Sequence, residues 1–142
     1  MADFHRLPGD TPEIDNDLNQ GELITSIDLP PNYFNTHYSY LKLRDRTSYA
    51  FALVSVATAL HIEYGFIKEA RLALGGIAHK PWRDGEAEEF LRDKQPNAEN
   101  FAIASDIILR DAKGHEHNKF KIELTKRAIV RNGLTAANLS QV

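Results

Sequence analysis

The chain has 142 residues, of which 42% are hydrophobic and 26% charged, a size and balance that predict one compact domain with a single core. Its formal net charge is -3, and the lysines and arginines are scattered among acidic residues, which argues against binding of nucleic acid or of an anionic membrane. The absence of cysteine excludes disulfides, thiolate catalysis and an iron–sulfur cluster held by this chain itself.

Residues 1–20 hold turn-forming residues and carboxylates without a sustained period, and they predict an irregular lead-in. The N-terminus lacks the apolar core that is typical of a signal peptide. The longest apolar run, AFALVSVATAL, is shorter than the roughly 20 residues that span a bilayer. We therefore expect a soluble chain without a membrane segment.

The first half of the chain predicts three or four β-strands. Residues 22–28 alternate apolar and polar side chains before a Pro-Pro pair, which favours a first strand, and residues 39–43 allow a short second one. The long apolar segment 49–78 is interrupted by a single turn-like sequence, Tyr64-Gly65-Phe66. This segment therefore predicts a long antiparallel hairpin.

The length of the hairpin loop decides which side chains face each other across the two strands. A three-residue loop pairs Val56 with Leu74 and Leu60 with Ala70. A two-residue loop would instead place Leu60 against Glu69, and burying that charge beside the apolar row would cost several kcal/mol. We therefore expect the three-residue loop.

After the strands the apolar period becomes that of helices. Three helices are expected, over residues 85–94, 98–112 and 119–132, with Asp84, Asn97 and Asn118 as their respective N-caps. Gly133 would end the third helix in a left-handed conformation, and apolar residues on two sides of this helix predict that it is sandwiched. Strands followed by helices indicate an α+β domain, in which a three- to four-stranded antiparallel sheet is followed by three helices packed on one face.

Motifs that would identify an enzyme are missing from the sequence. It has no glycine-rich phosphate loop and no recognisable serine–histidine–carboxylate arrangement. His115 and His117 have a spacing that metal ligands use, but their polar setting without a third ligand favours a solvated loop. The acidic residues of the segment 86–89 are explained by the dipole of a helix N-terminus. We therefore expect neither a catalytic residue nor a metal site in this chain.

Two lysines and a pair of glycines leave their roles open. Gly75 and Gly76 end a predicted strand, where they either let the chain bend or approach another backbone closely, or form a surface for a bound cofactor or a partner subunit. Lys42 and Lys68 lie near apolar faces, and the expected register places Lys68 opposite Ile62. Each lysine either extends into water or meets an anionic ligand over the end of the sheet.

Four segments in the same order, GELITSIDLP, YLKLRDRTSYAFALVSVATAL, IKEARLALGGIAHKPWR and FKIELTKRAIVRNGL, resemble the C-terminal domain of the FAD-binding subunit of molybdenum hydroxylases. This group includes carbon monoxide dehydrogenases and xanthine dehydrogenases, and the lead-in FHRLPGDTPEIDNDL points most toward the three-subunit aldehyde oxidoreductases. The resemblance covers about residues 4–134. It implies that residues 21–142 form the flavoprotein C-terminal α+β domain and that residues 1–20 belong to a missing FAD-binding region.

The resemblance also implies a role in an oxidoreductase, although this fragment alone is not expected to be catalytic. In such enzymes a large subunit binds molybdopterin, a small subunit carries [2Fe-2S] clusters, and FAD passes the electrons to an acceptor. The domain would help to cover the flavin and contact both partner subunits, while the complete subunit, and not this fragment alone, would bind FAD. Flavin contacts would fall at Lys42, near Phe51 and at Lys68, and Ala50 stands where many relatives carry an acidic residue.

Other interpretations stay open at this point. The chain could be a stand-alone α+β interaction or dimerisation module without redox activity. Without the preceding region, apolar surface near the sheet ends would be exposed and would favour self-association. Trp82 is either a packing anchor or an aromatic surface for a flavin or a partner. The substrate and the electron acceptor are not readable, and both a cytoplasmic and a periplasmic location agree with the family.

Overall fold

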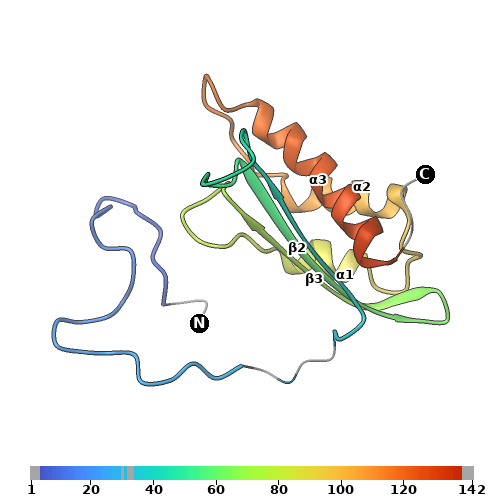
Figure 1. The fold of residues 1–142 in the computed structure, drawn as a ribbon, viewed down its shortest axis with the longest axis horizontal. Helices are drawn as coiled ribbons and strands as arrows, with labels where there is room; N and C mark the ends of the chain where they lie inside the picture. Colours follow the sequence, from blue (N-terminus) through green and yellow to red (C-terminus); the bar gives the residue numbers. More distant parts are fainter. Residues whose placement is uncertain (1–3, 30, 32–33, 139–142) are drawn as a thin grey trace.

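A computed structural model describes residues 4–29, 31 and 34–138. Three strands come first, β1 (His37–Leu43), β2 (Val54–Glu63) and β3 (Phe66–Gly75), and three helices follow, α1 (Gly85–Phe90), α2 (Ala98–Ile108) and α3 (Phe120–Ala136). The strands form one antiparallel sheet in the order β1-β2-β3. The helices lie on one face of this sheet (Figure 1), which confirms the predicted α+β class.

The core lies between the sheet and the helices. Every second residue of β2 from Val54 to Leu60 is buried, as the period of a half-covered strand requires. Helix α3 packs on β1 and β2 with one side and on α2 with the other, so the predicted sandwiched position is confirmed. Each fully buried leucine or isoleucine of this core, such as Leu72 or Ile129, contributes about 1.5–3 kcal/mol to folding.

The strand register of the hairpin is confirmed, but its predicted loop length is wrong. Val56 pairs with Leu74 and Leu60 with Ala70, as expected. The loop itself has two residues, Tyr64 and Gly65, and both have positive φ, which is the pattern of a type I′ turn. The two findings are compatible because a β-bulge shifts the pairing by one residue near the turn.

The bulge also changes the position of Lys68. Beyond His61 the pairing continues with Ile62 opposite Ile67, so the predicted pairing of Ile62 with Lys68 is wrong. Lys68 is the extra residue on β3, between the positions paired with His61 and Ile62. Because a bulged residue leaves the strand alternation, its side chain can turn away from the buried row and reach an acidic partner.

The strand predicted over residues 22–28 is not formed. These residues belong to neither a strand nor a helix, and the side chains of Leu23 and Ile27 are 74% and 60% exposed. In Figure 1 the segment runs outside the domain, away from the sheet. The prediction fails because alternation of apolar and polar residues favours a strand only where a neighbouring strand is present to accept its backbone hydrogen bonds.

Two of the three predicted helix caps are confirmed. The Asp84 carboxylate accepts the backbone N–H groups of Glu86 and Ala87, and the Asn97 side chain accepts that of Asn100. Asn118 does not cap α3, because its Oδ1 accepts the backbone N–H of His115 at 2.6 Å. Asparagine can close a local turn as readily as it caps a helix, and the sequence alone did not distinguish these uses.

Gly133 does not end α3, contrary to the prediction. The helix continues to Ala136, with Gly133 buried inside it. A Cβ atom at Gly133 would lie 2.7 Å from Cδ1 of Phe101 on α2. This glycine is therefore required for the close packing of two helices, a demand that is not visible in the sequence of α3 alone.

Two buried polar side chains connect the helices to the sheet. The Asn132 Nδ2 group on α3 lies 3.1 Å from the Val56 carbonyl, 3.1 Å from the Ser39 carbonyl and 2.8 Å from Thr58 Oγ1, all acceptors on β1 and β2. It therefore ties α3 to the centre of the sheet with hydrogen bonds that are shielded from water. At the β3 edge of the sheet, the buried Glu88 of α1 accepts the backbone N–H of Leu72 at 2.9 Å.

Candidate functional site

One face of the sheet is not covered by the helices, and β1 supplies much of it. Tyr38, Tyr40 and Lys42 alternate along β1 and are exposed, with the two tyrosines 66% and 65% exposed. A shallow hollow of about 380 Å³ lies over this open face, beside Ala57 and Ala59 of β2. The small alanine side chains leave space between the larger ones, so the open face is slightly concave, and Arg71 borders the hollow.

The most distinctive part of this surface lies at the end of β1, where Lys42 meets the loop that leads to β2. A hollow of about 410 Å³ is lined by Lys42, Tyr49, Ala50 and Phe51. The side chains of Tyr49 and Phe51 are each 97% exposed. An ammonium group beside two exposed aromatic rings suits a flat conjugated ring with electron-rich polar edges.

The loop that carries these aromatic residues is anchored at several points. The Arg46 guanidinium donates a hydrogen bond to the Tyr49 carbonyl. The Leu53 backbone N–H donates to the Leu43 carbonyl at 2.8 Å, which closes the loop onto β1. Tyr49 itself has a φ of 47°, in the left-handed region that non-glycine residues rarely adopt. Hydrogen bonds therefore hold this loop at Tyr49 and at its junction with β1.

The two glycines at the end of β3 lie directly behind this loop. Gly76 has a φ of 75°, and a Cβ atom there would lie 2.9 Å from the Ala52 carbonyl oxygen and 3.1 Å from that of Leu53. A Cβ atom at Gly75 would lie 2.6 Å from Ser55 Oγ. The interpretation that the strand end approaches another backbone closely is confirmed. Gly76 packs against the backbone of the aromatic loop and Gly75 against Ser55 of β2, and neither glycine lines the hollow.

The structure brings Lys42 and Phe51 together but places Lys68 elsewhere. Lys42 pairs with Ser55 at the start of β2, whereas Lys68 lies at the bulge near His61. Six to seven residues of β2 separate these positions, which is roughly 20 Å at 3.3 Å per residue. The backbones of the two lysines are therefore well separated along the sheet.

Lys68 also has an acidic partner of its own. Its Nζ atom lies 2.5 Å from Oδ1 of Asp93, which follows α1. The Lys68 ammonium beside Asp93 holds the pKa of that carboxyl below its ordinary value, through a hydrogen bond and charge attraction. The positive charge of Lys68 is therefore directed at Asp93.

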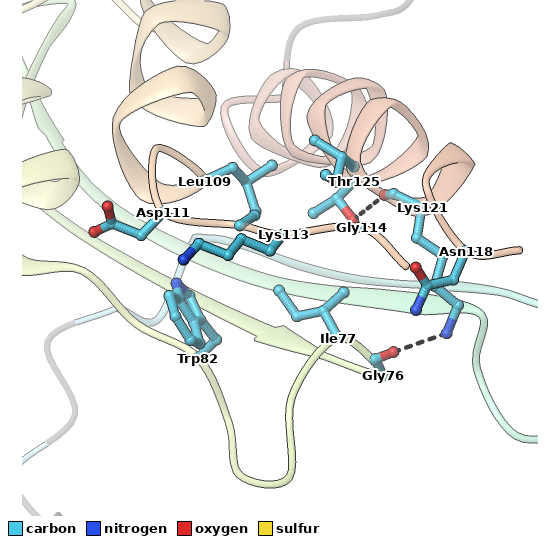
Figure 2. A pocket seen from close by; sticks show the side chains of 12 residues that line it. Gly76, Ile77, Trp82, Leu109, Asp111, Lys113, Gly114, Asn118, Lys121 and Thr125 are labelled. Carbon is cyan, nitrogen blue, oxygen red and sulfur yellow. Dashed lines mark hydrogen bonds between the residues drawn. The ribbon is translucent and has the colours of Figure 1, made fainter. Parts of the chain in front are cut away.

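A second cavity, of about 210 Å³, lies on the helical side of Gly76 (Figure 2). Lys121 Nζ donates to the Gly76 carbonyl at 3.1 Å, and Thr125 Oγ1 donates to the Lys121 carbonyl at 2.6 Å. The floor is apolar, with Ile77 and Leu109 among its lining residues. This cavity is bordered by α3 and the loop that precedes it, so Lys121 ties the end of β3 to the helical layer.

Trp82 borders the same cavity as a packing anchor. Its indole N–H donates to the Ile108 carbonyl at the end of α2, at 3.0 Å. Its backbone pairs with Leu74 through two hydrogen bonds of 2.9 Å, which cover the outer edge of β3. The interpretation of Trp82 as a packing anchor is confirmed, because its backbone pairs with β3 while its ring is bound to the end of α2.

Within the described part of the chain, no group of three histidine or acidic side chains could hold a metal ion, and His115 and His117 are exposed. None of the helices described is long and apolar enough to cross a membrane. Tyr49 is the residue of the hollow that the sequence did not indicate. An aromatic residue in a polar loop has no periodic signal, and the one available clue was its position two residues before Phe51.

The structure is an α+β domain with a hollow lined by a lysine and two aromatic side chains at one end of its sheet. Residues 38–135 match the CO dehydrogenase flavoprotein C-terminal domain family, and the chain belongs to this family. It is 41% identical over 129 residues to the aldehyde oxidoreductase FAD-binding subunit PaoB of Escherichia coli, which covers 91% of this chain and 37% of that subunit. It is 34% identical over 95 residues to the glyceraldehyde dehydrogenase medium chain of Sulfolobus acidocaldarius, covering 67% of this chain and 31% of the relative.

Solved structures of related enzymes share the fold. A carbon monoxide dehydrogenase from Hydrogenophaga pseudoflava that lacks the Mo-pyranopterin moiety matches with a TM-score of 0.69 and 21% identity, over 80% of this chain and 40% of that one. Quinoline 2-oxidoreductase from Pseudomonas putida 86 matches with a TM-score of 0.65 and 24% identity, over 72% of this chain and 37% of that one. The chain thus spans less than two fifths of the length of the curated relatives it matches.

Proposed function

We propose that this chain is the C-terminal domain of the FAD-binding subunit of a molybdenum hydroxylase of the aldehyde oxidoreductase type, and that it covers the flavin. The hollow of Lys42, Tyr49, Ala50 and Phe51 carries this proposal, because a cation and two almost fully exposed aromatic side chains line it together. The similarity to a curated FAD-binding subunit over 91% of the chain supports it.

The residues present fit an isoalloxazine ring. Phe51 offers an exposed apolar face of the kind on which flat conjugated rings rest, and Lys42 offers a positive charge beside it. When bound, FAD supplies the ability to accept electrons and pass them to an acceptor. The part of this chain is to exclude water from the ring with Phe51 and to favour negative charge near Lys42. Lys68 is separated from this set and its proposed flavin contact is tested below.

We also propose that the lead-in, residues 1–20, belongs to the FAD-binding region of the subunit, and that residues 21–29 lie against that region. The family match begins at residue 38, whereas the similarity to the E. coli subunit begins no later than residue 14. Between these positions Leu23, Ile27 and Leu29 are 74%, 60% and 83% exposed. A cluster of such exposed apolar side chains is typical of a surface that another part of the protein covers. The part of the E. coli subunit outside the match, which is the larger part of its length, could provide that cover.

The partners that follow from this assignment are a molybdopterin-binding large subunit and a small subunit with [2Fe-2S] clusters. Electrons would pass from the clusters to FAD, and this domain would close one side of that path without being catalytic alone. The exposed open face, with Tyr38 and Tyr40 on β1, supports a contact with a partner surface. The same face also favours the second candidate function, a dimerisation module in which two copies cover each other.

Purification of the chain from its host through an affinity tag tests the proposal. Co-purification of flavin, iron and molybdenum with two further polypeptides is the expected result, and an absorption spectrum with metal analysis measures it. A colourless preparation that contains this chain alone, as a dimer, would contradict the flavin role and support the dimerisation module.

A further inference from the structure

Tyr49 stands out among the described residues for its exposure and its backbone. Its side chain is 97% exposed, although burial of an aromatic ring is one of the larger favourable terms in folding. Its φ of 47° lies in the left-handed region, which costs free energy for a residue with a Cβ atom. The exposed side chain of such a residue contributes no burial energy to folding, while its backbone conformation costs free energy. Residues with strained backbones are enriched at binding sites.

The strain at Tyr49 is maintained by neighbouring groups. Arg46 donates to the Tyr49 carbonyl, and the loop beyond it lies against Gly76, where a Cβ atom would be 2.9 Å from the Ala52 carbonyl oxygen. Contacts therefore hold the loop at the Tyr49 carbonyl and again at Ala52, while the side chain of Tyr49 stays exposed. This side chain lines the hollow with Lys42 and Phe51.

Tyr64 provides a comparison within the same chain. It is 95% exposed, has a φ of 52° and precedes Gly65 in the hairpin turn. The conformation of Tyr64 is explained by its turn, because a type I′ turn requires positive φ at both central residues. No two-residue hairpin turn explains that of Tyr49, and Tyr49 has a lysine and a second aromatic ring beside it. The two tyrosines are thus matched in exposure and backbone but differ in surroundings.

We propose that Tyr49 is a second aromatic contact of the flavin, stacking on the isoalloxazine ring that Phe51 and Lys42 also touch. This inference rests on the proposed function and adds a residue to its site. Two aromatic side chains from one fixed loop, with a cation at the edge, hold a flat ring more firmly than Phe51 alone. Stacking on a phenol ring also has a spectroscopic consequence, because electron transfer from tyrosine quenches the fluorescence of a bound flavin.

The test uses the enzyme assembled around this chain, isolated through a tag, freed of flavin and titrated with FAD. Tyr49→Ala is expected to weaken FAD binding about tenfold and to raise the fluorescence of the bound flavin. Tyr49→Phe keeps the ring but not the phenol, so its affinity for FAD is expected to stay within about twofold of the wild type while the fluorescence of the bound flavin rises. Tyr64→Ala, the matched control, is expected to change neither quantity.

The outcomes separate this inference from the proposed function. If the wild type binds FAD and Tyr49→Ala matches it in affinity and quenching, the flavin role stands and the role of Tyr49 is refuted. If the wild-type assembly neither contains flavin nor binds FAD, the proposed function fails and this inference with it. If Tyr49→Ala does not assemble, Tyr49→Leu keeps apolar bulk without a ring, and unchanged quenching in that variant refutes the stacking role.

Discussion

Replacement of Gly76 by alanine tests whether the end of β3 supports the aromatic loop. A Cβ atom at this position would lie 2.9 Å from the Ala52 carbonyl oxygen and 3.1 Å from that of Leu53. Both are backbone atoms, so the loop itself must move. The φ of 75° adds the cost of a left-handed residue, about 1–2 kcal/mol. Displacement of a packed backbone adds about 1–3 kcal/mol, which gives a total loss of about 2–5 kcal/mol.

Gly65 provides the control for the backbone conformation alone. It has a φ of 80°, but no atom lies within 4 Å of a Cβ placed there. Gly65→Ala should therefore lose about 1–2 kcal/mol, and the difference between the two variants measures the contact with the loop. Urea denaturation gives both free energies of unfolding. Equal losses in the two variants would refute the claim that Gly76 packs against the aromatic loop.

Three further predictions concern the helical layer and Lys68. Gly133→Ala should destabilise the protein by about 1–2 kcal/mol, because the 2.7 Å contact with the Phe101 ring outweighs the gain in helix propensity, and urea denaturation would show a gain instead if the helices could separate freely. Asn132→Leu should cost about 2–4 kcal/mol by leaving buried acceptors on β1 and β2 unpaired, and a loss below 1 kcal/mol in thermal denaturation would contradict this role. Lys68→Met should raise the pKa of Asp93 toward its ordinary value, as NMR titration would measure. Because Lys68 lowers the pKa of Asp93 in the folded state, the ion pair should increase the free energy of unfolding near neutral pH, and this contribution should disappear as the pH falls below about 4. A difference in stability between wild type and Lys68→Met that does not depend on pH would refute the ion pair.

The register of the hairpin was predictable because burial of charge excluded the alternative. A register shifted by one residue would have placed the Glu69 carboxylate against Leu60 in the buried row, at a cost of several kcal/mol. The turn was not predictable in the same way. A bulge absorbs one residue at little cost, so the positions beyond His61, Lys68 among them, do not follow from the register of the strands.

The predictions that failed concern residues whose structure depends on a partner far away in the sequence. Gly133 has the signature of a helix end, but its role is set by Phe101 on another helix. Residues 22–28 have the signature of a strand, but no neighbouring strand pairs with them in the described structure. Of the candidate site, the structure brings Lys42 and Phe51 together, while Tyr49 became visible only from its exposure and its backbone angle.

The most direct test of the flavin role compares the two lysines in the enzyme assembled around this chain. Lys42→Met and Lys68→Met remove the same charge from the two ends of the sheet, and flavin content per chain with the dissociation constant for FAD measures each effect. The account predicts that Lys42→Met weakens FAD binding about tenfold and that Lys68→Met leaves it within about twofold of the wild type. Equal effects of both substitutions, or an effect of Lys68→Met alone, would contradict a flavin site at the hollow of Lys42 and Phe51.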